Sequence, residues 1–220
     1  MKEKIAQEYN VSSKVDFTLL DARATYADLE KLCDVAYKNR YYSVCVNPCN
    51  VSYVSGYIAK NFSDELKVVS VVGFPLGANT IDTKVFEAKQ AIQNGACEID
   101  VVINIGRAKN GDFDYVKNEL TKIKKAIKKV PLKAIIETCY FDENEIVKLC
   151  KVCVAAKVDF VKTSTGFGIG GATVSNVALM KKVVAGKCFV KASGGVRSRE
   201  QAVEFLNHGA DRIGTSYIVW

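Results

Sequence analysis

Short apolar runs alternate with longer amphipathic stretches along the whole of this 220-residue chain. The runs are rich in Val and Ile, as expected for buried strands, and the stretches between them repeat apolar residues at helical spacing. This pattern predicts strands at residues 15–20, 42–46, 67–72, 97–103, 132–137, 159–162, 188–191 and 212–214. It predicts helices at residues 26–38, 52–61, 83–93, 113–129, 143–156, 176–184 and 199–208, with a short extra helix at 2–9.

The helix boundaries carry the expected signals. Ser198 precedes one predicted helix, and Asn94-Gly95 and His208-Gly209 follow two others. Strands that alternate with helices pair in parallel through right-handed crossovers. Eight such strands in 220 residues predict a single (β/α)8 barrel domain over residues 1–220. A doubly wound open sheet is the alternative, but no G-x-G-x-x-G turn follows the first strand.

Composition and charge exclude several classes of function. Apolar residues make up 49% of the chain and charged residues 25%, which allows a full core. The net charge is +7, yet the densest basic run, at 122–129, keeps apolar residues at helical spacing. This favours a solvated helix face over a nucleic-acid site. No secretory start and no long apolar segment is present, so we expect a cytoplasmic protein without a membrane span.

The eight cysteines do not resemble a disulfide framework, because their spacing is irregular and most lie in apolar runs. Cys150-x-x-Cys153 stands alone in a helical pattern, and His208 is the only histidine. A zinc site would need more ligands at suitable spacing. We therefore expect free cysteines in a reducing compartment, no metal and no cofactor.

Charged residues occur where the strands should be buried. Alternation along the fourth strand places Glu98, Asp100, Val102 and Asn104 on one face and Ile99, Val101 and Ile103 on the other. The apolar face should pack on the outer helices, so Asp100 should point into the barrel. The same alternation turns Lys133 and Glu137 inward on the fifth strand, although the role of Glu137 stays open.

Lys162 and Lys191 end the sixth and seventh strands and should share one cavity with Asp100. A purely structural ion-pair cluster is an equally open interpretation of such buried charges. However, two lysines beside one carboxylate leave excess positive charge, which together with burial disfavours one ammonium group. One lysine could then act as a free amine that forms a Schiff base, while the other stays protonated.

Three loops beside these lysines suit an anion. They are TSTG at 163–166, which contains Thr165, SGGV at 193–196 and GTS at 214–216. Glycines let backbone N–H groups approach phosphate oxygens, and hydroxyl groups add donors. Each loop alone could be a simple turn, but together they predict a phosphorylated substrate.

The segments VKTSTGFGIGGAT, VKASGGVR, EIDVVINIG, VVGFPLGA and GADRIGTS resemble deoxyribose-phosphate aldolases, a class I aldolase family, from about Val15 to Ser216. The resemblance implies a Schiff base on Lys162 and proton transfer by Asp100 and Lys191. It implies phosphate binding by Gly166, Gly194, Gly195, Gly214 and Ser216, and a substrate cavity lined by Thr18 and Cys45. The implied reaction is reversible, metal-free cleavage of 2-deoxy-D-ribose 5-phosphate to acetaldehyde and D-glyceraldehyde 3-phosphate.

The resemblance also leaves alternatives. Another Schiff-base aldolase or a transaldolase-like enzyme would keep Lys162 but use a different sugar phosphate. A non-catalytic phosphosugar-binding protein is a third candidate, although all three reactive side chains are present. Phe17 stands where many members carry a histidine, which should alter packing rather than activity. Relatives are often dimers, so a homodimer is one assembly to expect.

Overall fold

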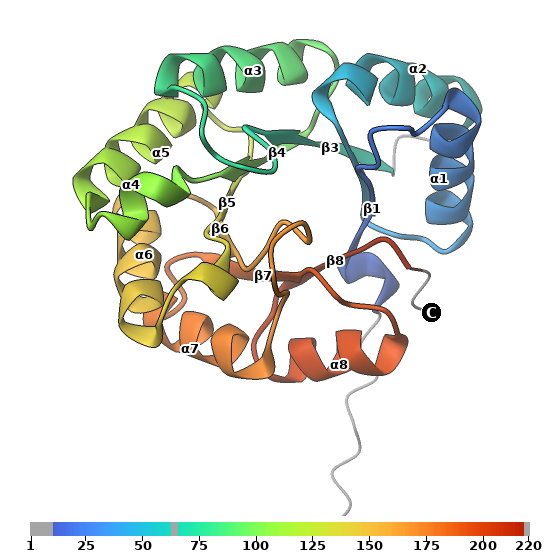
Figure 1. The fold of residues 1–220 in the computed structure, drawn as a ribbon. Coiled ribbons are helices and arrows are strands. Elements are labelled where there is room, and N and C mark those ends of the chain that lie inside the picture. The colour runs from blue at the N-terminus through green and yellow to red at the C-terminus, as the bar shows by residue number, and fades with distance from the viewer. Residues whose placement is uncertain (1–10, 63–65, 218–220) are drawn as a thin grey trace, which may run out of the picture.

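Within residues 11–62 and 66–217, which this computed structural model describes, eight parallel strands close into a barrel in chain order (Figure 1). The strands are β1 (Val15–Leu19), β2 (Ser43–Val46), β3 (Lys67–Val72), β4 (Glu98–Val102), β5 (Leu132–Ile135), β6 (Phe160–Lys162), β7 (Phe189–Ser193) and β8 (Arg212–Thr215). The helices are α1 (Tyr26–Lys38), α2 (Val51–Asn61), α3 (Ile81–Gln93), α4 (Ile105–Lys109), α5 (Phe113–Ile127), α6 (Glu143–Ala155), α7 (Val174–Val184) and α8 (Arg199–Asn207). Short 3-10 turns lie at Ser12–Lys14, Pro48–Asn50 and Thr138–Tyr140.

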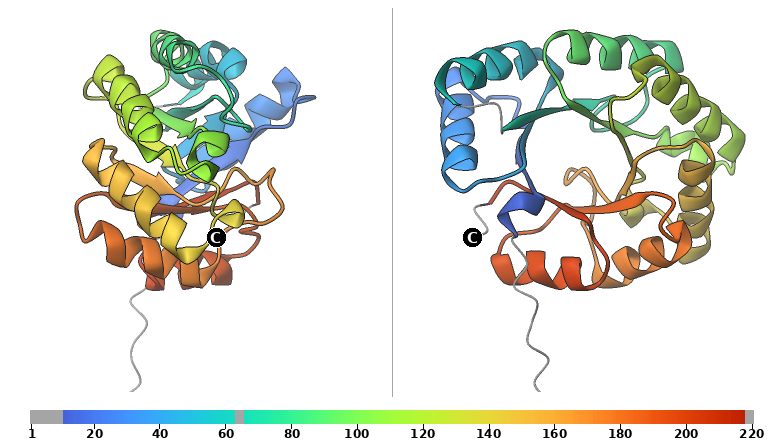
Figure 2. Two further views of the ribbon diagram at one scale, coloured as in Figure 1. Left: turned by 60° about the vertical axis from the view of Figure 1, so that its left-hand side comes forward. Right: turned by 180° about the vertical axis from the view of Figure 1, so that it is seen from behind.

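The barrel closes where β1 pairs with β8, with Asp16 opposite Gly214. This closure confirms the predicted (β/α)8 barrel and rules out the open sheet. The helices form a ring outside the strands, which is also visible from the side and from behind (Figure 2). The predicted helix at 2–9 lies outside the described residues.

Two local expectations at the strand ends were wrong. The fifth strand stops at Ile135, because Glu137 takes the left-handed backbone conformation (φ 51°) and turns the chain. Asn104 does not continue the inward face of β4. Its side chain instead accepts a hydrogen bond from the backbone N–H of Arg107 (3.0 Å) and caps α4, a helix that the periodicity did not predict.

The apolar core lies between the strands and the helices. Ile99 and Val101 on the outward face of β4 are fully buried there, as the alternation predicts. Inside the barrel, Cys45, Val69 and Val71 form a small separate apolar cluster. Branched apolar side chains usually fill the interior of such barrels. Here much of that space is occupied by charged groups, which marks the interior as the candidate site.

A buried ion pair outside the barrel holds the end of β4. The Lys84 ammonium group donates to the carbonyl of Val102 (2.8 Å) and to Glu119 (2.6 Å). The second carboxylate oxygen of Glu119 accepts from the backbone N–H of Asn104 (2.9 Å). Both charged side chains are fully buried, so α3 and α5 are tied to the strand that carries Asp100.

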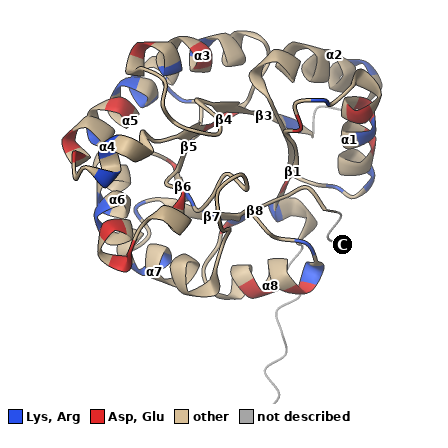
Figure 3. Cartoon of the chain, viewed as in Figure 1, with Lys and Arg blue, Asp and Glu red and all other residues tan. Residues whose placement is uncertain are grey.

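The outer helices carry basic and acidic residues interspersed, as expected for solvated helix faces (Figure 3). All eight cysteines are free, which confirms that they form no disulfide framework. Among the residues that the structure describes, no helix has the length and apolar character needed to cross a membrane.

Candidate active site

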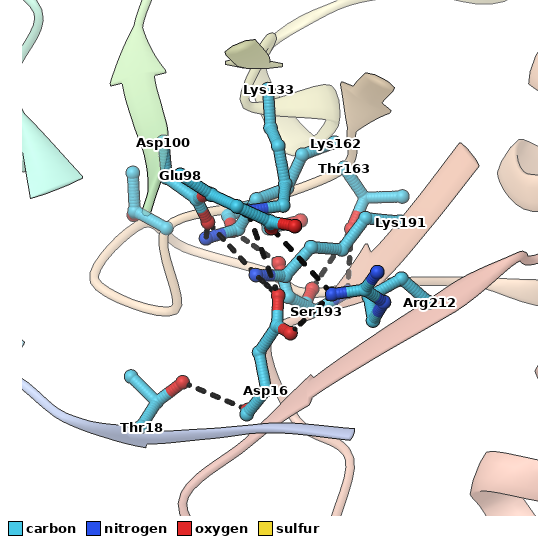
Figure 4. A network of polar contacts seen from close by, with 12 residues as sticks. Asp16, Thr18, Glu98, Asp100, Lys133, Lys162, Thr163, Lys191, Ser193 and Arg212 are labelled. Carbon is cyan, nitrogen blue, oxygen red and sulfur yellow. Dashed lines mark hydrogen bonds and ion pairs between the residues drawn. The ribbon is translucent and has the colours of Figure 1, made fainter. Parts of the chain in front are cut away.

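Asp100 lies at the centre of the candidate site. Its Oδ2 atom accepts hydrogen bonds from the ammonium groups of Lys162 (2.9 Å) and Lys191 (2.8 Å). The three side chains come from β4, β6 and β7 and converge inside the barrel (Figure 4). Asp100 and Lys191 are fully buried, and the Lys162 side chain is 5% exposed. The structure thus brings together the three residues that alternation along the strands placed in one cavity.

Further charged side chains surround this trio. Lys133 on β5 contacts Asp100 Oδ1 (2.7 Å) and Glu98 Oε2 (2.6 Å). Asp16 on β1 contacts the Lys191 ammonium group with one oxygen and Arg212 Nη1 (2.7 Å) with the other. We call the whole set the barrel charge cluster; it consists of Asp16, Glu98, Asp100, Lys133, Lys162, Lys191 and Arg212.

The cluster contains three carboxylates and four basic groups, so it carries one positive charge in excess when all are ionised. Asp16 and Glu98 add two carboxylates to the single one that the sequence predicted, but the excess charge keeps the same sign. Burial lowers the pKa of Lys162, and the Lys191 charge lowers it further against the attraction of Asp100. Loss of the Lys162 proton would leave three charges of each sign.

Lys191 behaves differently because it contacts two carboxylates. Burial opposes its charged form, but Asp100 and Asp16 outweigh burial and raise the pKa of Lys191. Burial would also raise the pKa of Asp100, yet Lys133, Lys162 and Lys191 together hold that pKa well below its usual range. The surroundings therefore favour the neutral form of Lys162 but the charged forms of Asp100 and Lys191.

Aromatic and hydroxyl groups hold Asp16, Glu98 and Arg212 within the barrel charge cluster. The Arg212 guanidinium lies over the Tyr42 ring, 3.5 Å from its centroid. Ser43 Oγ donates to Asp16 Oδ1 (2.7 Å), and Tyr42 itself donates to Glu98 (2.8 Å). Burial disfavours the charged form of Lys133, but its carboxylate neighbours raise the pKa above the ordinary value. These contacts fix Asp16 and Glu98 in position.

Sequence reasoning did not single out Asp16 or Arg212. The signal was present, because Asp16 shares strand parity with Thr18, and Arg212 shares it with Gly214. The same alternation test that found Asp100, applied to the first and last strands, would have placed both side chains inside the barrel.

Cys45, which was expected to line the substrate cavity, is fully buried inside the barrel next to Val69 and Val71. Burial raises the pKa of its thiol to about 11, and the charges of Lys162 and Lys191 act in the opposite direction. The thiol is therefore protonated at neutral pH and packs with Val69 and Val71 inside the barrel, while its place beside a substrate stays a prediction.

The three glycine- and hydroxyl-rich loops are joined to one another. Ser193 Oγ donates to the carbonyl of Ser164 (2.6 Å), and Thr163 Oγ1 donates to that of Ser193 (2.9 Å). Thr215 Oγ1 donates to the carbonyl of Val196 (2.7 Å) and links the third loop to the second. The loops after β6, β7 and β8 thus form one continuous edge at the carboxyl end of the barrel.

Glycines shape this edge. Gly166, Gly194 and Gly195 have φ values of 86°, 85° and 80°, a region that favours glycine. Gly194 also approaches the Gly171 backbone so closely that a Cβ atom on Gly171 would lie 2.2 Å from the Gly194 carbonyl oxygen. The two loops can pack backbone to backbone only because both positions lack side chains.

Glu137 contacts the first of these loops rather than Lys191. Its buried carboxylate accepts from the backbone N–H of Thr165 (3.2 and 3.3 Å to the two oxygens) and from the Thr165 hydroxyl group. The Thr165 hydroxyl oxygen accepts in turn from the backbone N–H of Phe167 (3.0 Å). Glu137 therefore holds the β6–α7 loop in place, which the sequence left undecided.

Three remaining predicted site residues lie at β1 and β8. Gly214 is within β8, where a Cβ atom would lie 3.0 Å from Cε of Lys191, so this glycine also makes room for that side chain. Thr18 and Ser216 line a groove of about 550 Å³ beside α1, together with Phe17. Phe17 is buried, with its ring centroid 5.4 Å from that of Tyr41. The functional roles of these residues stay predictions.

Comparison with known proteins agrees with this geometry. Residues 9–216 match a family model described as the DeoC/LacD family aldolase. The deoxyribose-phosphate aldolase of Thermococcus gammatolerans is 49% identical over 94% of this chain and 92% of its own length. The solved structure of an aldolase named QR15 has a TM-score of 0.90 and 38% identity, covering 94% of this chain and 92% of its own.

A third relative, the deoxyribose phosphate aldolase of Aeropyrum pernix, is described as having a unique tetrameric structure. It has a TM-score of 0.87 and 33% identity, and the match covers 94% of this chain and 86% of that one. The family match spans nearly the whole barrel, including every strand that carries the barrel charge cluster. This chain therefore belongs to the DeoC/LacD family of aldolases.

Proposed function

We propose that this aldolase reversibly cleaves 2-deoxy-D-ribose 5-phosphate to acetaldehyde and D-glyceraldehyde 3-phosphate through a Schiff base on Lys162. The observation that carries the proposal is the unequal pair of lysines on Asp100. Lys162 has a lowered pKa and a side chain that reaches the cavity surface, whereas Lys191 is sealed between two carboxylates with a raised pKa. The relatives named deoxyribose-phosphate aldolase support the choice of substrate.

The first step is attack of the neutral Lys162 amine on the C1 carbonyl of the open-chain sugar. The carbinolamine that forms loses water, and its hydroxyl group takes a proton from the Lys191 ammonium group as it leaves. The product is an iminium ion, which accepts electrons from the neighbouring carbon–carbon bond.

Bond cleavage then requires a base for the C3 hydroxyl proton. Asp100, kept ionised by its ammonium neighbours, takes this proton alone or through Lys191. The C3–O bond becomes the carbonyl of D-glyceraldehyde 3-phosphate, the C2–C3 electron pair moves toward the iminium nitrogen, and an enamine remains. Protonation of the enamine carbon and hydrolysis of the imine release acetaldehyde and regenerate Lys162. General acid–base help of this kind is worth roughly 10²–10⁴-fold.

The joined loops after β6, β7 and β8 support a phosphate group at the other end of the substrate. They carry Gly166, Gly194, Gly195 and Ser216, whose backbone N–H groups and, at Ser216, hydroxyl group suit phosphate oxygens, whereas both donors of Thr165 already bind Glu137. The Ser164 hydroxyl group is buried and makes no hydrogen bond with any described residue, so a donor is left free at this edge. A phosphate site after the last strands is a frequent arrangement in such barrels.

Borohydride trapping tests the proposal directly. Reduction in the presence of 2-deoxy-D-ribose 5-phosphate should leave a mass adduct that maps to Lys162, and Lys162→Leu should abolish both adduct and turnover. The matched control is Lys187→Leu, which removes an exposed lysine just before β7 and should keep both. An adduct on another lysine, or trapping that survives Lys162→Leu, would show that the nucleophile is a different residue.

A second candidate is a Schiff-base aldolase for a different sugar phosphate, because the matched family covers more than one aldolase type. Comparing kcat/KM for the deoxyribose phosphate with that for ketose phosphates separates the two. Higher kcat/KM with a ketose phosphate, and an adduct still on Lys162, would support the second candidate.

The assembly and the compartment are further parts of the proposal. We expect a homodimer, in contrast to the tetramer described for the Aeropyrum pernix relative, and light scattering of the purified protein measures it. Eight free cysteines support a reducing cytoplasm. Fractionation of cells that express the native chain tests this location.

A further inference from the structure

Two phenylalanines from different loops meet above the carboxyl end of the barrel. Phe74 lies in the loop between β3 and α3, and Phe167 lies in the loop between β6 and α7. Their ring centroids are 5.2 Å apart at 86°, an edge-to-face contact. Both loops extend over the same end of the barrel in Figure 1. The mechanism above uses neither side chain.

Phe74 covers the apolar side of the cavity. Its ring packs against the interior cluster of Cys45, Val69 and Val71 on β2 and β3. Val71 pairs in register with Asp100, which accepts a hydrogen bond from the Lys162 amine (2.9 Å), so this cluster lies beside the reactive lysine. Inside the barrel, β2 and β3 thus supply an apolar wall, and the charged side chains come from the other six strands.

The loop that carries Phe74 is firmly anchored. The backbone N–H of Gly73 donates to Glu87 (2.7 Å), and that of Gly77 donates to the Gly73 carbonyl (2.7 Å). Gly77 also lies against Ile103, where a Cβ atom would be 1.9 Å from the carbonyl oxygen. This loop therefore presents Phe74 from a fixed position.

Phe167 is anchored through the β6–α7 loop, one of the predicted phosphate loops. Its backbone N–H donates to the Thr165 hydroxyl group, which Glu137 holds in turn. Its side chain is 60% exposed, and its ring contact with Phe74 joins the two sides of the barrel mouth. The ring therefore lies between the predicted phosphate loops and the apolar wall.

We propose that the Phe74–Phe167 pair, acting with this apolar wall, restricts the donor of the aldol reaction to a two-carbon aldehyde. The inference rests on the proposed function. The charged side of the cavity must face the C3 hydroxyl group, which leaves the C2 carbon of the enamine against the apolar wall beneath Phe74. A longer aldehyde places its extra methyl group on C2, in the space that the aromatic pair closes.

An additional methylene group in a filled pocket changes kcat/KM by roughly 10- to 200-fold. We therefore expect Phe74→Ala and Phe167→Ala to raise kcat/KM for propanal relative to acetaldehyde by at least about 10-fold. The reaction is measured in the synthesis direction with D-glyceraldehyde 3-phosphate as acceptor. Because either substitution breaks the same contact, the double variant should gain less than the product of the two single gains.

The controls remove exposed apolar side chains elsewhere. Ile169→Ala acts in the same loop at a side chain that is 85% exposed, and Phe86→Ala acts on α3 at a ring that is 66% exposed. Both should keep the wild-type ratio of propanal to acetaldehyde. Phe167→Leu keeps an apolar side chain without the ring, and an intermediate ratio is expected if that variant folds like the wild type.

The outcomes separate this inference from the proposed function. Borohydride and acetaldehyde should trap the wild type at Lys162, and if they do not, the proposed function and the inference both fail. If the wild type is trapped but both alanine variants and Phe167→Leu keep the wild-type donor ratio within twofold, only the inference fails. A rise in the ratio for Ile169→Ala equal to that for Phe167→Ala would also overturn it, because general loosening of the loop would then explain the result.

Discussion

Lys162 and Lys191 donate hydrogen bonds to the same carboxylate oxygen, Oδ2 of Asp100, at 2.9 and 2.8 Å. Their environments differ in one respect that decides their protonation. Lys191 also contacts Asp16, whereas Lys162 has Asp100 as its one carboxylate partner among the described residues. Burial lowers the pKa of Lys162, and the second carboxylate helps to raise that of Lys191. One shared oxygen thus lies between a lysine with a lowered pKa and a lysine with a raised pKa.

Lys191→Met should move the pH dependence of Schiff-base formation to higher pH. The Lys191 charge lowers the pKa of Lys162, so its removal lets that pKa rise and leaves less free amine at neutral pH. We expect the acid limb of trapping rate against pH to shift upward and turnover at neutral pH to fall at least about 100-fold. The measurement is the rate of borohydride-trapped adduct across a pH series.

Lys187→Met is the matched control for this shift, because it removes an exposed lysine just before the same strand. It should leave the acid limb in place. An unchanged limb in Lys191→Met would mean that Lys191 does not set the protonation of Lys162.

Substitution of Lys162 itself should not destabilise the protein, although it removes a buried ion-pair partner. Lys162→Met leaves three basic groups and three carboxylates, and Asp100 Oδ2 still pairs with Lys191. Lys133→Met instead leaves Glu98 and Asp100 Oδ1 without their lysine, which should cost about 3–5 kcal/mol. Urea unfolding of the two variants beside the wild type gives both free energies.

The effect of Lys162 on the free energy of unfolding changes with pH in a defined direction. A folded-state pKa of Lys162 below its unfolded value means that Lys162 costs stability at neutral pH, and that this cost falls as pH rises from the folded pKa to the unfolded pKa. Any gain in unfolding free energy that Lys162→Met gives should therefore shrink toward alkaline pH. If Lys162→Met lowers the unfolding free energy by several kcal/mol at neutral pH, the assignment of excess positive charge to the barrel charge cluster is contradicted.

The sequence was sufficient to place Asp100, Lys162 and Lys191 in one cavity, because side chains alternate geometrically along a strand. It could not pair Asp16 with Arg212, since that contact joins residues 196 positions apart and depends on how the barrel closes. Helix α4 was missed for another reason: a five-residue helix is too short to produce a periodic pattern.

The role of Glu137 could not be predicted from the sequence for a different reason. Alternation turned this side chain inward, but its backbone adopts a left-handed conformation that ends the alternation. Which group a carboxylate meets beyond a strand end depends on the path of another loop, here the one that carries Thr165. Only the assembled structure brings the two together.

Glu137→Gln should weaken binding of the phosphorylated substrate more than it slows the chemical step. The amide can offer Thr165 one neutral oxygen in place of two charged ones, so the β6–α7 loop loses a charge-assisted anchor. A loss of about 1.5 kcal/mol corresponds to a rise in KM of roughly 10-fold. Steady-state kinetics with 2-deoxy-D-ribose 5-phosphate measure this, and Glu204→Gln on the exposed face of α8 is the control.

Unphosphorylated 2-deoxy-D-ribose tests whether Glu137→Gln acts through phosphate binding. It should be cleaved by Glu137→Gln about as well as by the wild type, because it has no phosphate group for the loops after β6, β7 and β8 to bind. Equal losses with both sugars would place the action of Glu137 at the reacting carbon atoms instead.

Gly171→Ala should separate the loops that follow β6 and β7. The added Cβ would lie 2.2 Å from the Gly194 carbonyl oxygen, which also accepts a hydrogen bond from the backbone N–H of Ala172 (3.0 Å). Backbone atoms must move to relieve this contact, so we expect a loss of about 1–3 kcal/mol in unfolding free energy and a higher KM for the phosphorylated sugar. Gly56→Ala is the matched control, because nothing lies within 4 Å of its Cβ position in α2, and it should stabilise the protein by about 0.5–1 kcal/mol. A Gly171→Ala protein with wild-type KM would show that the close approach of these loops is not needed for phosphate binding.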